Sequence, residues 1–441
     1  MTAPSSEAYV EKWLSSFSSE LRKHRSTPAQ PLTPSSLRSS PSIPAQSGKR
    51  KRSRSMPEPR SQSPQKRQRR LRSDEDIFPD QSASDLGITE LSERTRLSRP
   101  SQSAGSSPKR TTSPVRDLLN DLRVSKPSIL CEIPSSVILP ESAAALQHRL
   151  VDRLEEGLIP ASLKSNILAK YPSIAASIPT VAYDLSDTRS ANELSIIWDS
   201  VEEILSESRD CGRYQQDENA WCMKVVYPTL RLALKGNHSL KVESVQTQAI
   251  NPEVLPVTPK NYRVQKKADY AFSFHRNAPH ISDLYDQLYL EGLGDRISQT
   301  TDANTKRLAL FSGIEVKQEN GGKDEALAQL AIWLAAGLEN VRRLGEVGRK
   351  HQDLQEELHP VVGWTVIGHD WHTYIAYRVN QGGRDTFNVV GPWRVAAADT
   401  RDVYGVFKLL RLVKRAAQFA SDEYWPWLEK EILRPCLRTD D

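Results

Sequence analysis

Cysteine, methionine and glycine-rich phosphate-binding loops are scarce in this sequence. Its 441 residues include only 4 cysteines and 3 methionines. The cysteines form no Cys-x-x-Cys pair and no dense framework, so we expect a reducing compartment rather than a disulfide scaffold. The sequence also lacks a glycine loop able to cradle phosphates, which gives no support for binding of ATP or a dinucleotide.

Long apolar runs are absent as well. No stretch approaches the 18 apolar residues of a membrane span, so we expect no membrane partner. Residues 18–115 hold few large apolar side chains and are rich in Ser, Pro, Gln and Arg. Such a segment cannot bury enough apolar surface to fold. We therefore predict that residues 1–115 form a disordered, basic, Ser/Pro-rich tail.

Positive charge is concentrated in this tail. Residues 1–115 hold 21 Lys plus Arg against 11 Asp plus Glu, whereas residues 116–441 hold 39 against 44. Two basic clusters, at 49–52 and 66–70, resemble a bipartite nuclear localisation signal. We expect residues 49–70 to bind a nuclear import receptor, which places the protein in the nucleus; a nucleic-acid-binding arm and an unspecific basic stretch are the alternatives.

The first residues of the tail contain a short amphipathic segment. Val10, Trp13, Leu14 and Phe17 follow the spacing of one helical face. A helix of this length is marginal alone. Residues 10–17 therefore either dock on a protein partner or fold back on their own chain.

Regular patterns begin near residue 116. Apolar residues recur at helical spacing in 141–157, 160–170 and 191–207. We interpret 116–210 as a helical lead-in and 211–435 as the main domain. In that domain, residues 241–250 alternate like a strand. The patterns over 361–368 and 371–377 predict a hairpin that turns through Gly368, His369 and Asp370.

Charged residues interrupt two apolar strands of this domain. Glu315 and Lys317 follow the apolar run 308–311, and residues two apart on a strand share a face, about 6.6 Å from each other. Asp269 lies in the alternating run 267–274. If the two strands are neighbours, about 4.8 Å apart, the two carboxylates can hold one hard divalent cation.

This set of groups suits hydrolysis of a phosphodiester. A Mg²⁺ (or Mn²⁺) ion on Asp269 and Glu315 would lower the pKa of bound water and polarise the phosphate. The Val316 carbonyl could add a third oxygen ligand, and Lys317 could orient the water and neutralise developing charge. The alternative is a surface ion pair, because Glu-x-Lys alone is a weak signal.

Two further polar residues lie on predicted helices. Glu218 follows Asp217, a candidate N-cap, and shares a stripe with Trp221 and Val225. It either faces the site or is a first-turn acid favoured by the helix dipole. Gln329, on a strong helix over 323–347, either points at the site or lies solvated at the edge of the apolar stripe.

In sequence order these segments resemble the PD-(D/E)XK nuclease superfamily, specifically the fungal group of PD-(D/E)XK nuclease-like domains. The resemblance rests on residues 217–221, 267–270, 314–317, 328–333 and 366–371. It implies an α/β, restriction-endonuclease-like fold with an α-β-β-β-α-β core. It also implies Asp269 and Glu315 as metal ligands, Lys317 as the catalytic lysine, and supporting roles for Glu218 and Gln329. The proline that often precedes the first motif acid is replaced by Ala268.

Two functions from different classes follow. The first is a metal-dependent nuclease acting on nucleic acid, with DNA favoured over RNA. The second is a nuclease-like fold that has lost most catalysis and serves as a nucleic-acid- or protein-binding module. The intact Asp, Glu and Lys favour the enzyme, whereas the negative charge balance of residues 116–441 and the missing proline favour the module.

Overall fold

The computed structural model describes residues 88–89, 114–349 and 357–437, all within one compact unit spanning residues 78–441. Most of the predicted tail, including segments 10–17 and 49–70, lies outside the described residues. Two tail residues form a short strand, β1 (Ile88–Thr89), which pairs in parallel with β6 (Arg263–Val264). No helix in the described part of the chain is both long and apolar enough to cross a membrane.

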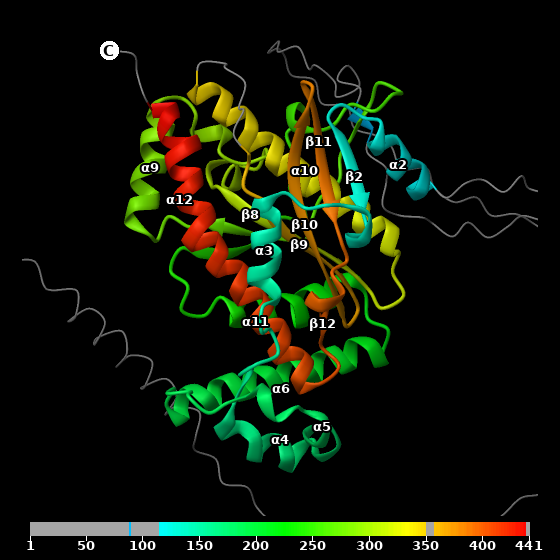
Figure 1. Ribbon diagram of the computed structural model, residues 1–441, viewed down its shortest axis with the longest axis vertical. Helices are drawn as coiled ribbons and strands as arrows, with labels where there is room; N and C mark the ends of the chain where they lie inside the picture. Colours follow the sequence, from blue (N-terminus) through cyan, green and yellow to red (C-terminus); the bar gives the residue numbers. More distant parts are fainter. Residues whose placement is uncertain (1–87, 90–113, 350–356, 438–441) are drawn as a thin grey trace, which may run out of the picture. The chain divides into compact units, whose positions relative to one another are not determined.

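A mixed sheet forms the centre of this unit (Figure 1). Its strand order is β2-β11-β10-β9-β8-β7-β5, with β12 also pairing with β10. The β2/β11 and β8/β9 pairs are parallel, and the other pairs are antiparallel. The strands are β2 (Ser128–Glu132), β5 (Leu240–Ser244), β7 (Tyr270–Phe274), β8 (Leu310–Lys317), β9 (Val361–Ile367), β10 (Asp370–Gln381), β11 (Arg384–Val390) and β12 (Ala398–Asp399). The predicted neighbourhood of the Asp269 and Glu315 strands is thereby confirmed.

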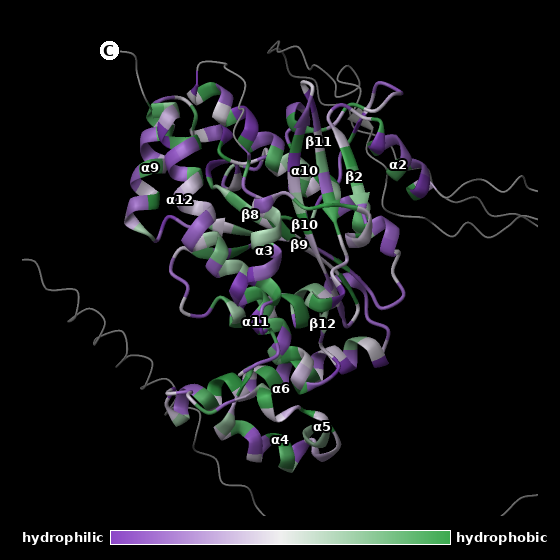
Figure 2. Ribbon diagram, in the orientation of Figure 1, coloured by the Kyte–Doolittle hydropathy of each residue, from purple (hydrophilic) through white to green (hydrophobic). Residues whose placement is uncertain are grey.

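One face of the sheet is covered by α10 (Lys323–Gly348), which packs on β8 and β9. Two strand glycines permit this close approach. A Cβ on Gly313 would lie 2.5 Å from the Trp333 ring, and one on Gly363 would lie 2.9 Å from the Leu330 side chain. Hydrophobic residues predominate in these inner strands (Figure 2). This composition is typical of strands such as β8, which is buried on both faces.

The other face is covered by the C-terminal helices α11 (Val403–Phe419) and α12 (Trp425–Trp427). Aromatic contacts join these layers: Phe274 stacks on Tyr424, with ring centroids 6.1 Å apart, and lies 4.7 Å from Trp425. Tyr424 and Trp425 are buried. These C-terminal aromatic residues therefore pack the C-terminal helices against the sheet.

The segment predicted as a helical lead-in also contains strands, among them β3 (Ile159–Pro160) and β4 (Tyr183–Asp184), which pair in parallel. It contains α2 (Pro114–Arg123), α3 (Glu141–Val151), α4 (Lys164–Lys170), α5 (Pro172–Ser177) and α6 (Ala191–Arg213). It also contains β2, which joins the edge of the sheet beside β11. The predicted boundary at 210/211 falls inside α6, and buried residues on both sides of it belong to one hydrophobic core. The three-part division stays a prediction.

The helix predicted from the candidate N-cap Asp217 begins where expected. The Asp217 side chain accepts a hydrogen bond from the Ala220 amide at 2.9 Å and caps α7 (Glu218–Trp221). A π-helical turn over Cys222–Val226 then leads into α8 (Tyr227–Ala233), which carries Pro228 in its first turn. The chain is helical on both sides of this proline, which follows the π-helical turn closely; such turns accommodate a break in the regular hydrogen-bond ladder.

The predicted hairpin is also confirmed. Ile367 at the end of β9 pairs with Asp370 at the start of β10, which leaves Gly368 and His369 as the turn. Gly368 has a φ of +56°, a conformation that glycine adopts without steric cost.

Candidate metal centre

A bulge between β7 and β8 sets the local geometry. Tyr270 pairs with Ile314 and Phe272 with Phe311, so Ser312 and Gly313 together oppose a single residue of β7. Ser312 has a φ of +73°, and its carbonyl accepts a hydrogen bond from the Trp333 indole at 3.1 Å. The bulge shifts the register so that the polar end of β8 lies beside the start of β7.

Asp269, one residue before β7, is attached to β8 through both its backbone and its side chain. Its amide donates to the Ile314 carbonyl at 2.9 Å, and its Oδ2 accepts from the Val316 amide at 2.7 Å. The carboxylate thus occupies the position of a backbone acceptor in the β-ladder. This fixes its orientation at the edge where β8 carries its own acid.

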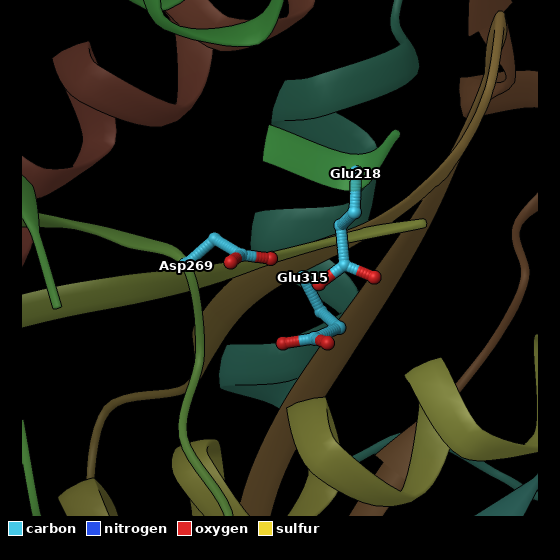
Figure 3. Close-up of side chains that lie close together, drawn as sticks. All are labelled: Glu218, Asp269 and Glu315. Carbon is cyan, nitrogen blue, oxygen red and sulfur yellow. The ribbon is translucent and has the colours of Figure 1, made fainter. Parts of the chain in front are cut away.

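Three carboxylates converge at this edge (Figure 3). Glu218 comes from α7, Asp269 from the start of β7 and Glu315 from β8, and one oxygen of each lies within 4.8 Å of the other two. Asp269 and Glu315 are 7% and 1% exposed, whereas the Glu218 side chain is 42% exposed. The predicted approach of Asp269 to Glu315 is therefore present, and Glu218 joins them from the more exposed side.

Lys317 places a positive charge against two of these acids. Its Nζ lies 2.8 Å from Glu315 Oε1 and 3.1 Å from Glu218 Oε2. Burial alone would lower the pKa of this ammonium, but the charges of Glu315 and Glu218 outweigh burial and hold the pKa above its usual value. Lys317 is therefore a cation at neutral pH.

Burial raises the pKa of the Glu315 carboxyl well above its usual value. The negative charge of Asp269 raises this pKa further, whereas the positive charge of Lys317 lowers it. The buried thiol of Cys222, one helical turn after Glu218, also has a raised pKa, mainly through burial and then through Asp269. Negative charge at this site is thus poorly solvated.

The donor set fits a hard divalent cation. Mg²⁺ and similar ions prefer carboxylate and carbonyl oxygens. When all three acids are ionised, their three negative charges exceed the one positive charge of Lys317 by two, which is the charge of one divalent ion. In the described part of the chain, this is the one group of three or more His, Cys, Asp or Glu side chains close enough to share an ion.

Two other predicted site residues lie on β8 and on the helix that packs against it. Val316 is fully buried, and its amide points towards Asp269. In an extended strand the amide and carbonyl of one residue point to the same side, so the Val316 carbonyl also faces the β7 side. Gln329 is 2% exposed on α10, the helix that packs on β8, so it is not the solvated edge residue of the alternative interpretation.

Gln246 is a residue of this site that sequence reasoning missed. It follows β5, and its Nε2 donates to Asp269 Oδ1 at 3.0 Å. The strand pattern over 241–250 predicts a neighbouring strand but assigns no role to Gln246. The sequence feature that could have indicated this role is the position of Gln246 just after the strand that pairs with β7.

His369, in the turn between β9 and β10, and His372, on β10, do not belong to the carboxylate cluster. The His369 ring packs edge-on against Trp221 of α7 at 5.0 Å, and its Nδ1 lies 3.1 Å from the Thr400 hydroxyl. This histidine therefore supports the helix that carries Glu218.

Comparison with known proteins agrees with this arrangement. The family model described as the PD-(D/E)XK nuclease superfamily matches residues 172–425, more than half of the chain. The matched range contains all three carboxylates, Lys317 and Gln329. No curated protein matches the sequence.

Proposed function

We propose that this chain, which belongs to the PD-(D/E)XK nuclease superfamily, hydrolyses phosphodiester bonds of DNA in the nucleus with the help of Mg²⁺ or Mn²⁺. The observation that carries the proposal is the convergence of Glu218, Asp269 and Glu315 within 4.8 Å, with the Lys317 ammonium 2.8 Å from Glu315. Membership of the fungal group within the superfamily stays part of the proposal.

Asp269 and Glu315 would hold the metal ion, with the Val316 carbonyl as a third ligand. Both carboxylates are buried and their positions are fixed by strands, so they lose little freedom on binding. When bound, the ion would polarise the phosphate and make a coordinated water more acidic. Glu218, which is more exposed, would complete the acidic set from the side of α7.

Lys317 would act as a fixed cation. Because its neighbours hold its pKa above the usual value, it donates hydrogen bonds and does not accept a proton at neutral pH. It would orient the attacking water and neutralise charge that develops on the phosphate oxygens, as preorganised cations do. Gln329, buried on α10, would support the site from the helix layer.

DNA and the nucleus are supported by the tail. Its basic clusters within residues 49–70 resemble a nuclear localisation signal, and an import receptor would be its partner. The amphipathic segment 10–17 would bind a further protein. The positive charge of the tail would also supply the non-specific affinity for phosphates that the negatively charged remainder of the chain lacks.

A cleavage assay with Mg²⁺ or Mn²⁺ on single-stranded, duplex and branched DNA, and on RNA, tests this function. The wild type should cut at least one DNA substrate, and Lys317→Met should lower the rate by about 100-fold, the usual cost of removing one transition-state donor. Lys414→Met, at an exposed position of α11, is the matched control. No cleavage of any substrate, with binding retained, would instead support the binding module.

A further inference from the structure

The Asp269 carboxylate has two identified donors, one on each oxygen. Oδ2 accepts the Val316 amide at 2.7 Å, and Oδ1 accepts the Gln246 Nε2 at 3.0 Å. The first donor is backbone and belongs to the sheet itself. The second is a side chain from a separate segment, so it depends on the amino acid at position 246 and not on strand pairing.

The Gln246 segment is held firmly on both sides. Val245 is fully buried, and its amide donates to the Asp269 carbonyl at 2.9 Å. Ile250 is fully buried and bridges to Thr300. Between them the chain turns, with the Gln248 amide donating to the Val245 carbonyl at 3.0 Å. The hydrogen bond from Val245 to Asp269 therefore fixes the backbone next to Gln246, whose side chain is half-buried.

The chemistry of an amide suits this position. An amide nitrogen donates a hydrogen bond but carries no charge, so it orients the Asp269 carboxylate without compensating its negative charge. A lysine or arginine here would compete with a divalent cation, and a carboxylate would add a further acid to the three already present. Hydrogen bonds to ligating carboxylates commonly tune metal affinity in this way.

We infer that Gln246 is a positioning residue, which holds Asp269 in the orientation that binds the divalent ion without itself touching metal or substrate. The inference rests on the proposed metal-dependent function and adds to it a residue outside the superfamily's acids and lysine. It predicts that loss of the amide weakens metal binding, while the fold and the chemistry at saturating metal are retained.

The test is titration of Mn²⁺ into the full chain, followed by calorimetry or by electron paramagnetic resonance of free Mn²⁺. Gln246→Met keeps the length of the side chain and removes the donor. It should weaken Mn²⁺ binding about 10- to 100-fold, the usual effect of losing a hydrogen bond to a metal ligand. Raising the metal concentration should then restore cleavage in Gln246→Met, whereas it should not restore cleavage in Lys317→Met.

Gln248→Met is the matched control on the same turn. The Gln248 Nε2 donates to the Ser244 carbonyl at 3.2 Å, and its Oε1 accepts from the Thr305 hydroxyl at 2.5 Å, so this side chain acts on the loop. This variant should lower the free energy of unfolding yet leave Mn²⁺ affinity within about twofold of the wild type, because it acts on the loop and not on the acid.

The possible results separate the two claims. If the wild type binds Mn²⁺ and Asp269→Asn weakens it, but Gln246→Met binds like the wild type, the positioning role is overturned and the nuclease proposal stands. If the wild type binds no Mn²⁺, both fail. Should Gln246→Met not fold, Gln246→Asn, whose amide is one methylene shorter and falls short of Asp269, serves in its place.

Discussion

The Lys317 ammonium lies 2.8 Å from the Glu315 carboxylate, two residues away on the same buried strand. The pair places a permanent cation directly against the acid proposed to bind a metal ion. Lys317 therefore has two opposing effects: it assists the reaction, and it competes for the negative charge that attracts the ion.

This competition can be measured. Lys317→Met should bind Mn²⁺ more tightly than the wild type at pH 8, because it removes the cation that pairs with Glu315 and Glu218. Titration calorimetry of the two proteins measures the difference. Weaker binding by the variant would show that the lysine helps to build the metal site and does not compete with the ion.

Metal binding should also stabilise the fold. A ligand that binds only the folded state raises the free energy of unfolding by about 2.7 kcal/mol at a free concentration 100 times its Kd. Urea unfolding with and without Mn²⁺ should show this increase for the wild type and none for Glu315→Gln, which removes the most buried ligand. Glu203→Gln, at an exposed position of α6, should behave like the wild type. An equal increase in all three proteins would mean that the ion binds elsewhere.

Gly313 should be intolerant of a side chain. A Cβ there would lie 2.5 Å from Cδ1 of Trp333, which is fully buried and cannot move aside. We expect Gly313→Ala to lower the free energy of unfolding by about 1–3 kcal/mol, the usual cost of overpacking. Gly337→Ala on α10, whose Cβ would approach other atoms no closer than 3.4 Å, should leave stability unchanged or raise it, since alanine favours helix. Equal stability of the two variants would contradict the packing described.

His359 should make stability depend on pH. Burial lowers its pKa below the ordinary 6.5, against the opposing charges of Glu423 and Glu357. The unfolded chain therefore takes up a proton first as the pH falls below 6.5, and the folded state loses stability relative to it. Urea unfolding between pH 7.5 and 5.5 should show a steeper loss for the wild type than for His359→Gln. Parallel curves would indicate that His359 titrates alike in both states.

Much of the site could be predicted from residue order. Alternation placed Asp269 on a strand that the structure begins one residue later, at Tyr270. The polar end of an apolar run placed Glu315 and Lys317 together; both patterns arise from the period of two along a strand. The cap at Asp217 located the start of the Glu218 helix. These features depend on local rules that the sequence displays directly.

The remaining features depend on contacts between distant segments. β2 pairs with β11 across more than 250 residues, and nothing within its five residues distinguishes it from a loop. The bulge at Ser312 places a non-glycine residue at positive φ, which local propensity disfavours. Gln246 acquires its role only because β5 lies beside β7. Tertiary packing decides each of these three features.

The most direct test of the metal centre is anomalous X-ray scattering at the manganese edge, from crystals of the full chain grown with Mn²⁺. We predict a peak bounded by the carboxylates of Glu218, Asp269 and Glu315, which disappears in crystals of Glu315→Gln. A map with no peak among these three residues, in crystals where the wild-type site is open to solvent, would contradict the account.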